Sequence, residues 1–157
     1  MQAFRVLVVD DETDFLETIV NRLRKRAIDA VGVTSGEAAV EMVRQQPFDA
    51  VILDVKMPGG MDGIECFRQI KKVQPLTEVI LLTGHASVET SIEGLKLGAF
   101  DYLLKPVKLE KLLQILAAAF EKKAAQDQKI RTARIRELLH SIGSEGGDEE
   151  ENEKGEI

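Results

Sequence analysis

The feature that most constrains the fold of this chain is a strict alternation of short apolar runs with amphipathic segments. Five apolar runs occupy residues 4–9, 28–34, 50–53, 79–82 and 102–104. After each run, apolar residues recur at helical spacing, beginning near residues 13, 35, 64, 87 and 109. Such alternation predicts an α/β fold, with a parallel sheet covered by helices on both faces. No run approaches the roughly 20 residues needed to cross a bilayer, so we expect a soluble, cytoplasmic protein.

Polar residues follow four of the five predicted strands. They are Asp10, Asp11 and Glu12 after the first run, Asp54 after the third, Thr83 after the fourth and Lys105 after the fifth. Right-handed crossovers bring the carboxyl ends of parallel strands to one edge of the sheet, where ligands of such sheets bind. We therefore expect these side chains to meet at that edge.

The chemistry of this set favours a phosphoryl site with a metal ion. A single Asp at a strand end is commonly a turn former or a helix cap. Several carboxylates together repel one another and need a counter-charge, which a hard cation such as Mg2+ supplies through oxygen ligands. Lys105 would add a fixed positive charge and Thr83 a hydroxyl donor, with a carboxylate as the nucleophile. The two glycines at 59 and 60 do not form a phosphate-binding loop signature, and the single cysteine excludes an internal disulfide.

Ordered motifs across residues 3–122 resemble the receiver domain of two-component response regulators. The matching stretches are residues 8–12 (VVDDE), 53–58 (LDVKMP), 61–63 (MDG), 81–84 (LLTG), 98–102 (GAFDY) and 104–106 (LKP). The sequence of residues 83–106 is most similar to those of receivers of enhancer-binding transcription activators. The resemblance implies a doubly wound, flavodoxin-like sheet of five parallel strands in the order 2-1-3-4-5, with a C-terminal helical extension. It also implies a phosphoacceptor signalling switch.

The resemblance assigns the central chemistry to four residues. Asp54 would accept the phosphoryl group from the phosphohistidine of a sensor histidine kinase. The carboxylates of Asp11 and Asp54 and the main-chain carbonyl of Lys56 would bind Mg2+, and Asp10 would act through a bound water. Phosphotransfer and autodephosphorylation would be self-catalysed, without any other enzymatic activity.

Further roles come from the same resemblance. Lys105 would pair with the phosphoryl oxygens, Thr83 would swing to the phosphate, and Tyr102 would follow inward. The residues alone favour simple packing for an aromatic side chain on a short strand, and only the resemblance makes Tyr102 a switch residue. The peptide bond before Pro106 is expected to be cis. His85, like Lys56, would flank the phosphoryl group and tune its lifetime.

The loop after Asp54 departs from the family pattern. The family motif Met-Pro-x-Met-Asp-Gly has one residue between Pro and Met, whereas this chain has Gly59 and Gly60. The extra residue follows the expected metal ligands, so the chemistry should survive while the loop path changes.

The sequence after residue 122 is compatible with several structures. Helical spacing continues to Gly143, a plausible stop, and residues 144–157 hold seven acidic residues and one lysine. We predict a helical extension at 123–143 and a disordered acidic tail at 144–157. The extension could be a dimerising coiled coil, a separate amphipathic helix, or a linker without its output domain. The six basic residues of the stretch 121–143, beside the acidic tail, do not predict DNA binding, and a homodimer stays open.

The function also has alternatives at this point. A downstream effector could read a surface changed by phosphorylation, or the chain could relay the phosphoryl group to a histidine phosphotransfer protein. It could instead be a non-phosphorylated interaction module with the same fold. A metal-dependent phosphohydrolase is disfavoured because Lys56 stands where such enzymes commonly carry a second Asp.

Overall fold

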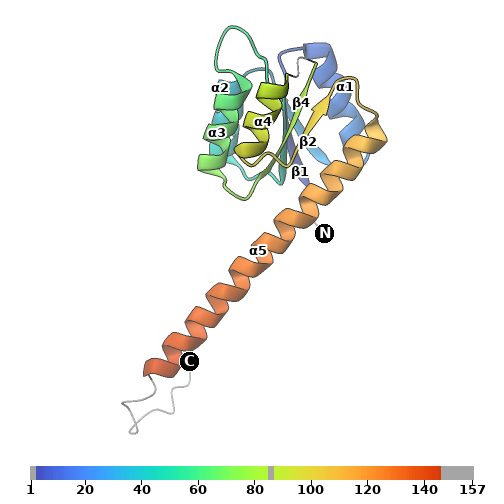
Figure 1. Cartoon of the computed structure of the whole chain (residues 1–157). Helices are drawn as coiled ribbons and strands as arrows, with labels where there is room; N and C mark the ends of the chain where they lie inside the picture. Colours follow the sequence, from blue (N-terminus) through green and yellow to red (C-terminus); the bar gives the residue numbers. More distant parts are fainter. Residues whose placement is uncertain (1–2, 85–86, 146–157) are drawn as a thin grey trace. The chain divides into compact units, whose positions relative to one another are not determined.

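The computed structural model describes residues 3–84 and 87–145, in which five strands alternate with five helices (Figure 1). The strands are β1 Arg5–Val9, β2 Asp29–Val33, β3 Ala50–Leu53, β4 Glu78–Thr83 and β5 Asp101–Leu104. The helices are α1 Thr13–Arg24, α2 Gly36–Gln45, α3 Gly63–Val73, α4 Val88–Lys96 and α5 Leu109–Glu145. The alternation predicted from the apolar runs is confirmed.

All neighbouring strands pair in parallel, in the order β2-β1-β3-β4-β5. This is the order that the resemblance implied. Strands β3 and β4 are buried along their whole length, which is why their sequences are nearly continuous in apolar residues. The pairing of Val9 with Leu53 places Asp10 and Asp54 side by side, one residue beyond the paired ends of β1 and β3.

Two aliphatic layers pack on the two faces of the sheet. On one face, side chains of β1, β3 and β4 contact α1 and the first turns of α5, including the fully buried Leu23 and Leu116. On the other face, alternate residues of the same strands contact α2 and α3, including the fully buried Phe67 and Ile70. Each fully buried Leu, Ile or Phe stabilises the fold by about 1.5–3 kcal/mol. The sheet edge that carries the polar residues therefore rests on a rigid base.

Short polar side chains define the starts of three helices. Ser35 accepts the amide of Ala38 at 3.1 Å and begins α2. Asp62 accepts the amide of Glu65 at 2.8 Å and begins α3. Ser87 caps α4, where its hydroxyl and that of Thr90 form a reciprocal capping box.

Helix α1 ends at Arg24, where the chain turns back toward the sheet. The amides of Ala27 and Ile28 turn back to the carbonyls of Arg24 and Leu23, and Ala27 takes a φ of 62°. The chain thereby reverses into β2 before the apolar pattern has run out.

Helix α5 continues without interruption from Leu109 to Glu145. The predicted stop at Gly143 is wrong: a glycine inside a helix costs only about 1 kcal/mol and does not by itself end it. The chain divides into two compact units, Met1–Lys123 and Ala124–Ile157. The predicted acidic tail lies almost entirely outside the described residues.

The two units differ in how their apolar residues are covered. Within the first unit, Lys122 contacts the buried carboxylate of Glu78 at 3.4 Å, and Lys123 contacts Asp49 at 3.6 Å. Within the second unit the apolar side chains are exposed, namely Ile130, Ile135, Leu138, Leu139 and Ile142. Among the described residues, none of the helices is long and apolar enough to span a membrane.

Candidate functional site

Three carboxylates converge at the carboxyl edge of the sheet. Asp10 follows β1 and Asp54 follows β3, and only 2% and 3% of their surfaces are exposed. Carboxylate oxygens of Asp10, Glu12 and Asp54 all lie within 4.8 Å of one another. Asp10 also accepts the amide of Glu12 at 2.9 Å, and Asp54 accepts that of Lys56 at 3.2 Å, so both carboxylates are held in fixed orientations.

The ammonium group of Lys105 provides the counter-charge. Its Nζ lies 2.6 Å from Asp10 Oδ2, 3.5 Å from Asp54 Oδ2 and 4.0 Å from Glu12 Oε1. The ring of Phe15 on α1 lies beneath it, with the Nζ 4.0 Å from the centroid. The bond from Lys105 to Pro106 is cis, as predicted, and the Lys105 amide donates to the Thr83 carbonyl at 3.0 Å.

Burial and charge act in opposite directions on this pair. Burial raises the pKa of Asp10 above its ordinary value, and the hydrogen bond from Lys105 offsets this only in part. Burial alone would lower the pKa of Lys105, but the hydrogen bond to Asp10 and the charges of Asp10, Asp54 and Glu12 outweigh it and raise the pKa. The raised pKa of Lys105 keeps its ammonium group charged beside Asp10 and Asp54 at neutral pH.

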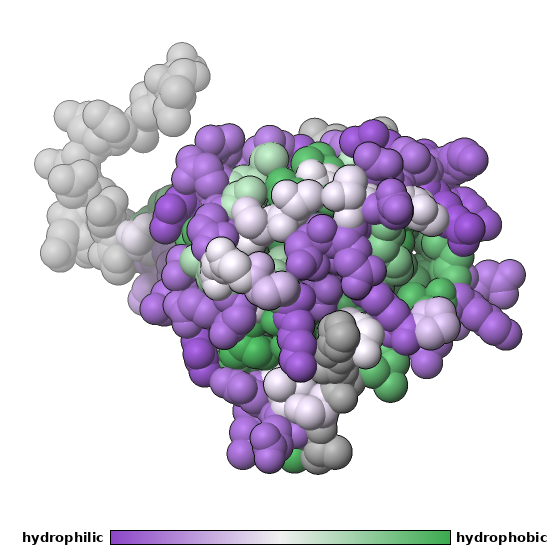
Figure 2. Space-filling model, turned by 90° about the horizontal axis from the view of Figure 1, so that it is seen from above, coloured by the Kyte–Doolittle hydropathy of each residue, from purple (hydrophilic) through white to green (hydrophobic). Residues whose placement is uncertain are grey.

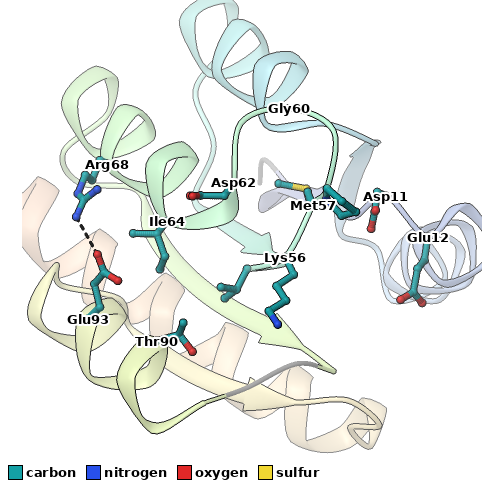
Figure 3. Close-up of a pocket in the computed structure, with 12 residues that line it drawn as sticks. Asp11, Glu12, Lys56, Met57, Gly60, Asp62, Ile64, Arg68, Thr90 and Glu93 are labelled. Carbon is teal, nitrogen blue, oxygen red and sulfur yellow. Dashed lines mark hydrogen bonds and ion pairs between the residues drawn. The ribbon is translucent and has the colours of Figure 1, made fainter.

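A cavity of about 680 Å³ opens beside these carboxylates, between the loop after β3 and helix α4 (Figure 3). Asp11, Glu12 and Lys56 stand at one end, and an ion pair between Arg68 and Glu93 at 2.9 Å stands at the other. Figure 2, which views the molecule from above, shows mostly hydrophilic residues with small hydrophobic groups between them. Charged side chains at both ends of the cavity make it suited to a polar reactant.

The close carboxylate group in the structure differs in one member from the metal ligands that the resemblance suggested. Asp10 and Asp54 belong to the close carboxylate group, and the third member is Glu12, which was not among the predicted ligands. Asp11 lines the cavity next to it and stands outside that group. Glu12 directly follows the Asp pair, so its position after the first strand was the available signal.

The two predicted switch residues lie on neighbouring strands. Thr83 is fully buried and is the last residue of β4, which extends one residue beyond the predicted run at 79–82. Tyr102 on β5 is half-buried, and its hydroxyl lies 3.1 Å from that of Thr90 on α4. Thr90 was not predicted as a site residue, although a hydroxyl three residues after Ser87 fits a capping box. His85 lies outside the described residues.

The lengthened loop after Asp54 is anchored from α2. Gly59 takes a φ of 92°, which favours glycine, and Glu37 accepts the amide of Met61 at 2.7 Å. At Gly63 a Cβ atom would lie 2.2 Å from the carbonyl oxygen of Asp54, so only glycine lets α3 begin this close to the site. The extra residue is accommodated in the outer part of the loop.

The single cysteine is a buried core residue next to this loop. Burial, with smaller contributions from Glu37 and Asp62, raises the pKa of Cys66 to about 12. We expect a thiol-reactive disulfide reagent at pH 8 to modify the native protein at least about a hundredfold more slowly than the urea-unfolded chain. Equal rates in a stopped-flow absorbance assay would contradict the buried position of Cys66.

Comparison with known proteins identifies the family that has this parallel sheet and this acidic site. Residues 6–117 match the response regulator receiver domain. The chain belongs to the response regulator receiver family. It is 40% identical over 114 residues to the transcriptional regulatory protein ZraR of Escherichia coli K12, covering 73% of this chain and 26% of that protein. It is 34% identical over 119 residues to the response regulator PilR of Pseudomonas aeruginosa, covering 76% and 26%.

Solved receiver structures share the fold. The receiver domain protein from Clostridium thermocellum aligns with a TM-score of 0.74 at 33% identity, covering 78% of this chain and 98% of that one. The BeF3-activated DrrB receiver domain aligns with a TM-score of 0.69 at 32% identity, covering 76% and 99%. The chain spans about a quarter of the length of the curated relatives that it matches, so the similarity concerns their receiver domain. Receivers are regulatory domains, and this receiver has the acidic pocket in which the family binds Mg2+.

Proposed function

We propose that this receiver is a phosphoacceptor switch in which Asp54 takes a phosphoryl group from the phosphohistidine of a sensor histidine kinase. The observation that carries the proposal is the buried Asp54 carboxylate beside Asp10, with the Lys105 ammonium within 3.5 Å of both. A carboxylate oxygen of Asp54 attacks phosphorus, the phosphorus–nitrogen bond breaks, and its electron pair leaves on the imidazole nitrogen. The products are an acyl phosphate on Asp54 and a free histidine on the kinase.

The carboxylate group fits a divalent cation. Asp10, Glu12 and Asp54 offer oxygens within 4.8 Å of one another. Asp11 and Lys56 line the adjoining cavity, and the resemblance suggests the Asp11 carboxylate and the Lys56 carbonyl as further ligands. Bound Mg2+ would neutralise the charge of the carboxylates and of the incoming phosphoryl oxygens. Lys105, which already forms an ion pair with Asp10, would pair with a phosphoryl oxygen once Asp54 is phosphorylated.

The output of the switch is conformational. Phosphorylation would draw Thr83 and then Tyr102 toward the phosphoryl group and shift a pre-existing equilibrium on the face formed by α4 and β5. The DrrB receiver supports this mode of action, since it is described as BeF3-activated and BeF3 mimics a phosphoryl group in shape and charge. Downstream effector proteins would bind the changed face formed by α4 and β5 of this receiver.

Phosphorylation itself is tested by incubating the protein with Mg2+ and acetyl phosphate and measuring its intact mass. We expect the mass of one added phosphoryl group, and no added mass when EDTA is present from the start of the incubation. An unchanged mass would favour an interaction module, whereas continuous release of phosphate at a high rate would favour a hydrolase. Transfer of the label to a histidine phosphotransfer protein would identify a relay.

The metal site gives a prediction that needs no phosphodonor. Because Mg2+ would bind only the folded carboxylate group, a hundredfold excess over its Kd should stabilise the fold by about 2.7 kcal/mol. Thermal denaturation with and without Mg2+ measures this as a rise in Tm. Asp10→Asn should lose most of the rise, while Asp62→Asn, which changes a nearby carboxylate outside the close group, should keep it. A rise that survives in Asp10→Asn would place the cation elsewhere.

A further inference from the structure

The hydroxyl of Thr90 lies where two structural elements meet. At the start of α4 it accepts the amide of Ser87 at 3.1 Å and donates to the carbonyl of the same residue at 3.1 Å. It also lies 3.1 Å from the phenol oxygen of Tyr102 on β5. A hydroxyl has one proton, so while Thr90 donates to the Ser87 carbonyl, the phenol of Tyr102 is the donor in their mutual hydrogen bond.

The close approach of α4 to the sheet depends on Gly94, one turn further along. A Cβ atom at Gly94 would lie 2.5 Å from Cδ1 of Leu81 and 3.6 Å from Cδ2 of Tyr102. Leu81 is the strand partner of Tyr102. The Tyr102 ring is therefore held against α4 by packing at Gly94 and by one hydrogen bond at Thr90.

We propose that Thr90 is a positioning residue that holds Tyr102 against α4 and thereby sets the resting balance of the switch. The inference rests on the proposed function, in which Tyr102 moves toward Thr83 after phosphorylation. That movement breaks the hydrogen bond between Tyr102 and Thr90 while the capping box keeps the Thr90 hydroxyl in place. The bond is made only in the resting state, so it weights the equilibrium toward that state by about fivefold.

Tyr102 can be observed directly, because the chain has one tyrosine and no tryptophan. Uniform labelling with 3-fluorotyrosine gives a single fluorine NMR signal from this residue. Mg2+ with BeF3 provides the signal position of the activated state. Thr90→Val keeps the shape of the side chain and removes the hydroxyl, and Thr90→Ser keeps the hydroxyl. Ser87→Ala removes the cap hydroxyl, which lies 2.9 Å from that of Thr90, but leaves the side chains of Thr90 and Tyr102 unchanged.

In the ligand-free protein, we expect the Thr90→Val signal to move toward the activated position. Its apparent BeF3 affinity should rise about fivefold, and Thr90→Ser and Ser87→Ala should stay within twofold of wild type. A Thr90→Val signal at the wild-type position would overturn the proposal. So would a Ser87→Ala shift as large as that of Thr90→Val, because the effect would then come from the helix end. Failure of wild type to respond to BeF3 would instead count against the proposed function, whereas an unmoved Thr90→Val signal in the ligand-free protein would overturn the role of Thr90 in either case.

Discussion

Asp54→Asn should accept no phosphoryl group from acetyl phosphate under conditions that label the wild-type protein. The amide is nearly the same size as the carboxylate but is not a nucleophile at neutral pH, so we expect labelling to fall by at least about a hundredfold. The fold should be retained or become more stable, because the change removes one of two buried carboxylates that face each other. Intact mass measurement after a timed incubation gives the labelled fraction.

The matched control for this variant is Asp62→Asn. It makes the same chemical change on the wall of the same cavity, and asparagine can still cap α3 in place of the aspartate. Labelling of Asp62→Asn at the wild-type level would show that the loss in Asp54→Asn is specific. Labelling of Asp54→Asn at that level would mean that another carboxylate is the acceptor.

Lys105→Met should destabilise the fold and slow phosphorylation. It leaves Asp10 and Asp54 buried without their shared cation, and breaking a buried ion pair of this kind costs about 3 kcal/mol. It also removes the positive charge that faces the phosphoryl oxygens, for which we expect about a hundredfold slower labelling. Urea denaturation measures the first effect and timed intact mass the second.

Two comparisons separate these effects from a general loss of charge. Lys108→Met removes an exposed lysine three residues away and should change neither quantity measurably. Mg2+ should stabilise Lys105→Met more than wild type, because the metal then provides the only counter-charge in the carboxylate group. A Lys105→Met protein as stable as wild type without Mg2+ would contradict the role of Lys105 as counter-charge.

Much of this site follows from patterns that are local in the sequence. The central strands β1, β3 and β4 are buried on both faces, so their apolar runs are visible, and parallel pairing brings Asp10, Asp54 and Lys105 to one edge. Ser35 was predictable as a cap because its hydroxyl stands directly before the helical spacing. These predictions needed only the period of the pattern and the direction of the strands.

Other features depend on side-chain directions that no periodicity encodes. Whether Glu12 or Asp11 joins Asp10 and Asp54 depends on how the chain turns into α1. The contact of Thr90 with Tyr102 requires α4 to lie close to β5, which Gly94 permits. The anchoring of the loop by Glu37 depends on the loop path that the extra glycine creates.

The most direct test of the account is to locate the phosphoryl group in the labelled wild-type protein. Borohydride reduces an aspartyl phosphate to homoserine, and peptide sequencing by mass spectrometry then identifies the converted position. We predict homoserine at position 54 alone, in an amount equal to the labelled fraction. Conversion at Asp10, Asp11 or any other carboxylate, or no conversion in a labelled sample, would contradict the assignment of Asp54 as the phosphoacceptor.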